Sequence, residues 1–139
     1  MDFLNKVNVS VRSEINLDKD IFKNLGFSTK AIHGGSKKND VGSAATPIYQ
    51  TSTFIFDSTE QGGRIFSGDE AGYRYTRFGN PTNAVLEEKL ALLEGAEACV
   101  STASGIGAIS TALWTTLKSG DHVISGETIY GDTFALLND

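Results

Sequence analysis

The order of the expected elements predicts an α/β protein with a mainly parallel sheet. A capped helix begins at Pro81 and is followed by a short apolar segment, 98–102, typical of a buried strand. A second helix then starts at Ser104-Gly105, and a second short strand is expected over 122–125. A last helix is expected over 128–137. Helices and strands that alternate through short loops are typical of parallel sheets with crossover helices.

The helix after residue 80 has the clearest boundaries. Asn80 is a preferred N-cap, and Pro81 supplies a suitable φ at a position where a missing N–H costs nothing. Gly95 is expected to end the helix in the left-handed conformation. Apolar residues recur at helical spacing between these ends, at Val85, Leu86, Leu90 and Leu93.

The first 80 residues are expected to be less regular. The expected elements are a helix over 18–24, a helical turn over 28–33, an extended segment over 47–56 and a helix over 59–66. The extended segment is rich in β-branched and aromatic residues. Ser58 and Gln61 have the spacing of a capping box, in which each side chain bonds a backbone N–H of the first turn.

Composition narrows the function classes. The chain has 139 residues, is 40% apolar and carries a net charge of −5, which fits a globular protein and argues against a nucleic acid partner. No apolar run approaches the roughly 20 residues of a membrane span. One cysteine, Cys99, fits a reducing cytoplasm. The chain ends a few residues into an expected helix without a stop signal, which predicts that it is a fragment.

The segment around Ser104-Gly105 indicates an anion site. Ligands of open α/β sheets bind beyond the carboxyl ends of strands, where the first N–H groups of a helix have no intrahelical partner. Gly105 allows close approach to the backbone, and the Ser104 hydroxyl adds a donor. The pattern is neither a dinucleotide fingerprint nor a P-loop, so one phosphate is favoured over a pyrophosphate. The alternative is a plain serine cap with glycines for packing.

Tyr75 and Arg77 indicate a second way of holding a phosphate. Arginine can bind phosphate through two parallel N–H bonds, and a phenol can add a third donor. The alternative is an exposed arginine with a tyrosine packed on its alkyl stem.

Tyr130, after the second expected strand, would lie at the same sheet edge as Gly105, where its ring could stack on a planar cofactor. The alternative interpretation of Tyr130 is a side chain that only packs at the start of a helix.

Metal chemistry is not indicated. His33 and His122 do not form a ligand set, and Cys99 is expected in a strand core.

Taken together, these motifs resemble the pyridoxal-phosphate-dependent enzymes of cysteine and methionine metabolism. The similar segments are Tyr75-x-Arg77-x-x-Asn80-Pro81-Thr82, Ser104-Gly105-Ile106-Gly107-Ala108-Ile109, Gly120-Asp121-His122 and Tyr130-Gly131, with 29–35 and 47–54 upstream. The resemblance covers about residues 26–139. Segments 54–58 and 105–110 resemble the methionine γ-lyase branch of that family most.

The resemblance implies the fold-type I architecture of pyridoxal-phosphate enzymes, in a homotetramer built from active dimers. Residues 1–25 would form a variable N-terminal arm, and 26–80 an extended segment with cofactor and dimer contacts. Residues 81–139 would be the start of the large cofactor-binding domain, with its mainly parallel sheet truncated.

The resemblance also implies roles for individual residues. Gly105 and Ile106 would give backbone N–H groups to the phosphate of pyridoxal 5'-phosphate, with Ser104 beside them. Tyr75 and Arg77 would reach the phosphate of the neighbouring subunit. Tyr130 would stack on the pyridine ring and serve as the acid toward the departing sulfur. The implied reaction is α,γ-elimination of L-methionine to methanethiol, ammonia and 2-oxobutanoate.

Two features depart from the family pattern. The Schiff-base lysine, the aspartate facing the pyridine nitrogen and the arginine for the substrate carboxylate would all lie beyond Asp139. Methionine γ-lyases usually carry a cysteine where this chain has Asp132, which leaves a more polar sulfur amino acid open as substrate. The alternatives are therefore O-acetylhomoserine sulfhydrylase, cystathionine γ-lyase or γ-synthase, and an inactive fragment that only associates with partners.

Overall fold

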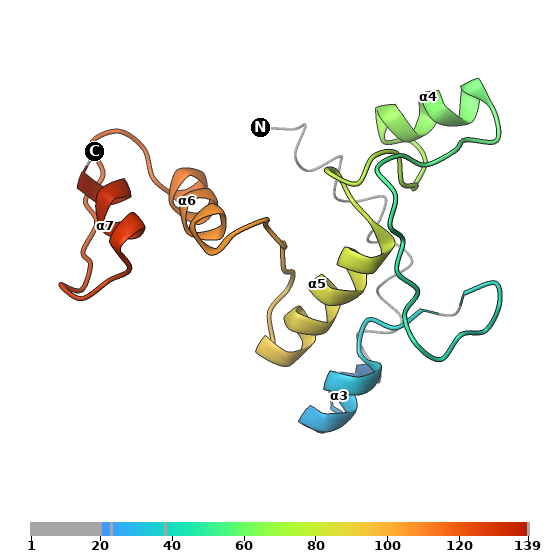
Figure 1. Cartoon of the computed structure of the whole chain (residues 1–139), viewed down its shortest axis with the longest axis horizontal. Coiled ribbons are helices and arrows are strands. Elements are labelled where there is room, and N and C mark those ends of the chain that lie inside the picture. Colours follow the sequence, from blue (N-terminus) through green and yellow to red (C-terminus); the bar gives the residue numbers. More distant parts are fainter. Residues whose placement is uncertain (1–20, 23, 38, 139) are drawn as a thin grey trace. The chain divides into compact units, whose positions relative to one another are not determined.

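The computed structural model describes residues 21–22, 24–37 and 39–138, which form two compact units. The first unit ends at Cys99, and the second runs from Val100 to the end of the chain. Figure 1 shows the helices of each unit. Most of the arm expected over 1–25, and with it most of the helix expected over 18–24, lies outside the described residues.

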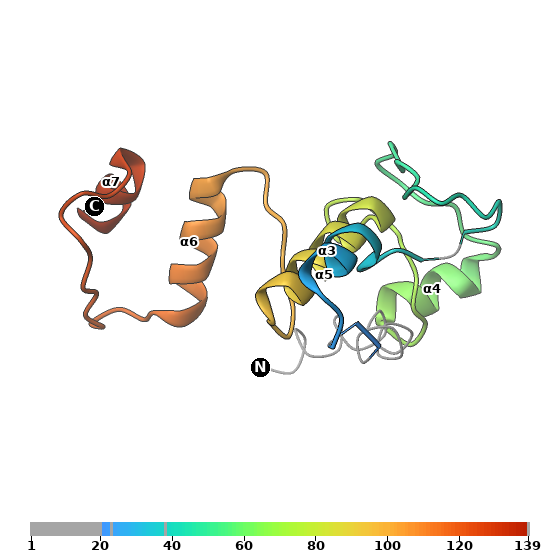
Figure 2. The ribbon, with the colours of Figure 1, turned by 90° about the horizontal axis from the view of Figure 1, so that it is seen from below.

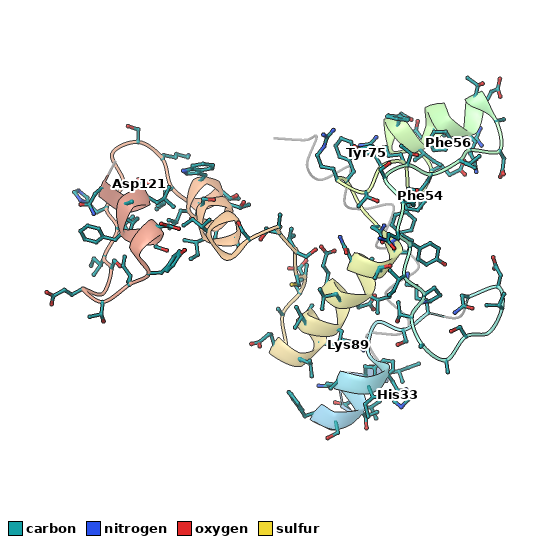
Figure 3. All side chains as sticks on the ribbon, in the orientation of Figure 1. His33, Phe54, Phe56, Tyr75, Lys89 and Asp121 are labelled. Carbon is teal, nitrogen blue, oxygen red and sulfur yellow. The ribbon has the colours of Figure 1, made fainter. Side chains whose placement is uncertain are left out.

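In the part of the first unit that the structure describes lie the helices α3 (Phe27–His33), α4 (Thr59–Ser67) and α5 (Pro81–Glu94). Helices α3 and α5 pack side by side (Figures 1 and 2). Gly35 permits this packing, because its φ is 71° and an added Cβ would lie 2.6 Å from the Val85 carbonyl oxygen. Lys89 of α5 donates from its Nζ to the Ile32 carbonyl oxygen at 3.2 Å, at the end of α3 near His33 (Figure 3).

The predicted caps of α4 and α5 are confirmed. Asn80 accepts the N–H of Thr82, and Gly95 ends α5 in the left-handed conformation. Ser58 accepts the Gln61 N–H at 3.1 Å, while Gln61 accepts the N–H of Asp57, one residue earlier than a standard capping box. The local sequence signals therefore fix both ends of α5 and the start of α4.

The segment over 47–56 is extended, as predicted, and runs antiparallel to the segment that carries Tyr75. The Phe54 N–H donates to the Arg74 carbonyl oxygen at 3.2 Å, and the Thr76 N–H donates to the Ser52 carbonyl oxygen at 2.9 Å. Phe54 also stacks on Tyr73, with ring centroids 5.3 Å apart. The Phe54 and Tyr75 side chains are labelled in Figure 3.

The second unit contains two helices, α6 (Gly105–Thr116) and α7 (Gly131–Asn138), which contact each other. Helix α6 starts where predicted. Helix α7 starts three residues later than the expected Thr128, because the first intrahelical acceptor is the Tyr130 carbonyl oxygen, 3.0 Å from the Phe134 nitrogen.

The predicted parallel sheet does not form within the described residues, where the only bridge joins Thr53 to Tyr75 and is antiparallel. The strands expected over 98–102 and 122–125 are irregular. Ile124 is fully exposed and Val100 is 74% exposed. A strand is stable only when a neighbour pairs its N–H and C=O groups, so apolar composition alone does not form one.

None of the helices in the described part of the chain has the length and apolarity needed to span a bilayer.

Candidate cofactor-binding site

The loop that carries Tyr75 and Arg77 is held by backbone bonds on both sides. A tight turn closes over it, because the Phe78 N–H donates to the Tyr75 carbonyl oxygen at 2.9 Å. The Thr76 hydroxyl donates to the Thr51 carbonyl oxygen, in addition to the backbone bond between Thr76 and Ser52. These bonds fix the loop to the extended segment 47–56, so the backbone that carries the Tyr75 and Arg77 side chains is held in place.

Asn80 is the centre of this arrangement. Its side chain is only 4% exposed. The amide nitrogen donates to the Tyr49 carbonyl oxygen at 2.9 Å and to the Thr76 hydroxyl at 3.1 Å, while the amide oxygen accepts the Thr82 N–H at 2.9 Å. One residue therefore caps α5 and joins the extended segment to the Tyr75–Arg77 loop.

Thr82 completes the connection. Its hydroxyl accepts the Tyr49 N–H at 2.9 Å and donates to the Pro47 carbonyl oxygen at 3.1 Å. From the sequence, Asn80 was predicted only as a cap, and no separate role was predicted for Thr82. The Asn-Pro-Thr order was the available signal. Because proline has no N–H, the Asn80 side chain must accept the N–H of Thr82. This order also places the Thr82 hydroxyl beside the cap.

An open groove of about 720 Å³ lies over this framework. Its lining is polar or aromatic apart from one isoleucine, and consists of Ile48, Tyr49, Gln50, Thr51, Ser52, Tyr75, Thr76, Arg77, Asn80, Thr82 and Asn83. Arg77 is the only charged residue among them. The one charge in the groove is therefore positive, and it is the feature that could attract a small anion.

The Arg77 guanidinium is stacked and not hydrogen-bonded within the described residues. It lies 5.2 Å from the ring centroid of Tyr75 and 5.1 Å from that of Phe78. Arg74, its neighbour, instead donates to the Phe66 carbonyl oxygen at 3.2 Å and lies over the Phe66 and Phe78 rings. The structure thus separates a structural arginine from one whose donors are available to a ligand.

The N-terminus of α6 supplies a second set of donors. The Ser104 hydroxyl accepts the Gly107 N–H at 3.1 Å, and the Ser104 carbonyl oxygen accepts the Ala108 N–H at 3.1 Å. The N–H groups of Gly105 and Ile106 meet no acceptor within the described residues. A Cβ added at Gly105 would have no atom within 4 Å, so the backbone there is open to a phosphate group.

Tyr130 precedes α7 and is 63% exposed. Its hydroxyl donates to the Asp132 carboxylate at 2.7 Å. This hydrogen bond and the carboxylate charge raise the pKa of the Tyr130 phenol. The pairing was not predicted from the sequence, where Asp132 counted only as a departure from the family pattern.

The predicted site residues thus lie in three places. Tyr75 and Arg77 share the groove of the first unit, Ser104, Gly105 and Ile106 share the start of α6, and Tyr130 pairs with Asp132. The described residues include no cluster of three or more histidine, cysteine, aspartate or glutamate side chains that could hold a metal ion.

Comparison with known proteins finds a matching family and several relatives. The sequence profile of the family described as Cys/Met metabolism PLP-dependent enzyme matches residues 28–139. An L-methionine gamma-lyase from Fusobacterium nucleatum subsp. polymorphum is 64% identical over 83% of this chain, and one from Treponema denticola is 57% identical over 88%. The matches cover 29% and 30% of those relatives, so the chain spans less than a third of their length.

A solved structure shares the backbone course. It is that of a putative O-acetylhomoserine (thiol)-lyase from Campylobacter jejuni subsp. jejuni, which contains N'-pyridoxyl-lysine-5'-monophosphate. The TM-score is 0.74 at 36% identity, over 81% of this chain and 28% of that one. The family match, which extends over most of the chain, confirms the resemblance stated above: this chain belongs to the pyridoxal-phosphate-dependent enzymes of cysteine and methionine metabolism.

Proposed function

We propose that this chain is the phosphate-binding part of a carbon–sulfur lyase that uses pyridoxal 5'-phosphate and acts on L-methionine. The observation that supports this most is the pair of anion-binding elements. One is a groove whose only charge is Arg77, and the other is a helix start with free N–H groups at Gly105 and Ile106. Both occur in the segments that match the family, and the relatives named above are L-methionine gamma-lyases.

The start of α6 fits the phosphate of the cofactor. Two N–H groups and the partial positive charge of a 12-residue helix favour a dianion there. The Ser104 oxygen already accepts the Gly107 N–H, so its own proton is left to donate to a phosphate oxygen. These residues would bind and orient the cofactor and leave its ring free to react.

Tyr75 and Arg77 would complete the phosphate site of a neighbouring subunit. The Asn80 and Thr82 bonds that fix their loop would hold the guanidinium and the phenol in position before the second subunit arrives. On this proposal the active form is at least a dimer, and a homotetramer of two such dimers is the expected assembly.

Tyr130 would lie against the pyridine ring and carry the proton that the departing sulfur needs. When bound, pyridoxal phosphate supplies the electron sink for bond cleavage next to the substrate amine. The phenol adds general-acid chemistry at its own oxygen, a contribution of roughly 10²–10⁴-fold in enzymes generally. The net reaction converts methionine and water to methanethiol, ammonia and 2-oxobutanoate.

The test compares two substrates on the full-length protein reconstituted with pyridoxal phosphate. Methanethiol release from L-methionine should dominate over sulfide-dependent consumption of O-acetylhomoserine. The Tyr130→Phe variant should retain bound cofactor and lose the methanethiol reaction by about 10²-fold or more. Dominant turnover of O-acetylhomoserine would overturn the assignment.

O-acetylhomoserine sulfhydrylase is the second candidate. Two observations favour it: Asp132 occupies the position where methionine γ-lyases usually carry cysteine, and the solved structure described above is named a putative O-acetylhomoserine (thiol)-lyase. The same two-substrate assay decides between the candidates, since both substrates are offered to one preparation.

A further inference from the structure

Asp132 has no part in the phosphate contacts, yet it is the residue that bonds the proposed acid. Its carboxylate oxygen lies 2.7 Å from the Tyr130 hydroxyl, which is the length of a strong charge-assisted bond. Asp132 also lies in the first turn of α7, where the helix dipole favours a negative charge.

Asp132 is the only charged group that acts on this phenol among the described residues. Helix α6, which contacts α7, has no ionisable side chain, and α7 has none besides Asp132. The connection between the helices carries Lys118, Asp121, His122 and Glu127, none of which contributes to the raised pKa of Tyr130. Of these, the Asp121 carboxylate accepts the Lys118 N–H at 2.8 Å and closes a turn. Both the hydrogen bond and the charge that favour the neutral phenol come from Asp132.

We propose that Asp132 is a positioning residue that fixes the direction of the Tyr130 hydroxyl and holds its proton in place until the leaving sulfur takes it. The proposal rests on the function proposed above, in which Tyr130 is the acid. It also assigns a use to the residue that departs from the family pattern. One oxygen of the carboxylate is bonded to the phenol, which leaves only the other to contact substrate.

The negative charge of Asp132 changes the pKa of Tyr130 in a predictable direction. A phenolate beside a carboxylate is disfavoured, so the pKa of Tyr130 is raised and the phenol stays protonated to higher pH. Removal of the charge should lower the pKa of Tyr130. The acid form would then be lost at lower pH, and the alkaline limb of the kcat profile should move in the same direction.

The experiment measures Tyr130 directly. Fluorotyrosine placed at position 130 of the full-length protein without cofactor reports its own ionisation by fluorine NMR as pH is raised. Asp132→Asn removes the charge and keeps the shape, and Asp132→Cys introduces the residue usual in methionine γ-lyases. Asp121→Asn is the matched control, because it also removes a carboxylate from the second unit. The Asp121 carboxylate bonds a backbone N–H and does not bond the phenol.

The expected result is a lower titration midpoint in Asp132→Asn and an unchanged midpoint in Asp121→Asn. Asp132→Cys should lower the midpoint less, because a thiol is itself largely ionised at the pH where a phenol titrates. In the holoenzyme, Asp132→Asn should lower kcat on the order of tenfold with KM little changed, a smaller loss than removal of the acid itself. A midpoint that does not move in Asp132→Asn overturns the proposal. This readout does not involve substrate, so it is independent of whether methionine or O-acetylhomoserine is turned over.

Discussion

Replacement of Asn80 by alanine should weaken both the fold of the first unit and its groove. The variant loses the cap of α5 and the two bonds from the amide nitrogen to Tyr49 and Thr76. A lost cap costs about 1 kcal/mol, and each further bond contributes about 0.5–1.5 kcal/mol. The free energy of unfolding should therefore fall by about 2–4 kcal/mol, measured by urea unfolding of the chain followed by circular dichroism.

Asn80→Asp separates the two roles. Aspartate keeps the oxygen that accepts the Thr82 N–H, so the cap remains, but it cannot donate to Tyr49 or Thr76. It should lose about as much stability as the two donated bonds provide, with Asn83→Ala on the same helix as the control. If Asn80→Asp were as stable as the native chain, the cap would account for the whole effect of Asn80, and the reasoning about the groove would be refuted.

Two further substitutions test the groove and the helix packing. Arg77→Ala in the full-length protein should weaken pyridoxal phosphate binding by about 1.5–3 kcal/mol, the usual range for a hydrogen bond to a charged group, while Arg74→Ala should leave the affinity unchanged. Equal effects of the two arginines on the dissociation constant would show that Arg77 is not a phosphate ligand. Gly35→Ala should destabilise the chain by more than the roughly 1–2 kcal/mol of left-handed strain, because its Cβ would also meet the Val85 carbonyl oxygen at 2.6 Å. Gly42→Ala has a similar φ in open space and should show the strain alone; equal losses of stability in the two variants would contradict close packing at Gly35.

The local signals in the sequence were sufficient for the helices. Asn80, Pro81 and Gly95 act within a few residues of one another, so the cap geometry of α5 follows from the chain itself. The same holds for the start of α6 at Ser104. Helix α7 shows the limit of such signals, because it starts at Gly131 and not at the expected residue 128.

The sequence predicted which residues could donate hydrogen bonds to an anion. It did not predict whether those donors are already bonded to other groups of the protein. An arginine pattern does not tell whether a guanidinium is already bonded, and Arg74 and Arg77 lie only three residues apart with opposite outcomes. The bond between Tyr130 and Asp132 joins residues two positions apart, yet it depends on the turn into α7. The sequence contained both residues, but it did not indicate that they bond.

The sequence by itself determined the family and most helix boundaries, because these depend on neighbours in the chain. Only the tertiary structure decided the role of Asn80, whose bonds reach Tyr49, 31 residues away, and the stacking of Arg77 on the Tyr75 ring. The parallel sheet shows the same division. The apolar segments 98–102 and 122–125 have the composition of strands, but strand formation depends on partners that local sequence cannot supply.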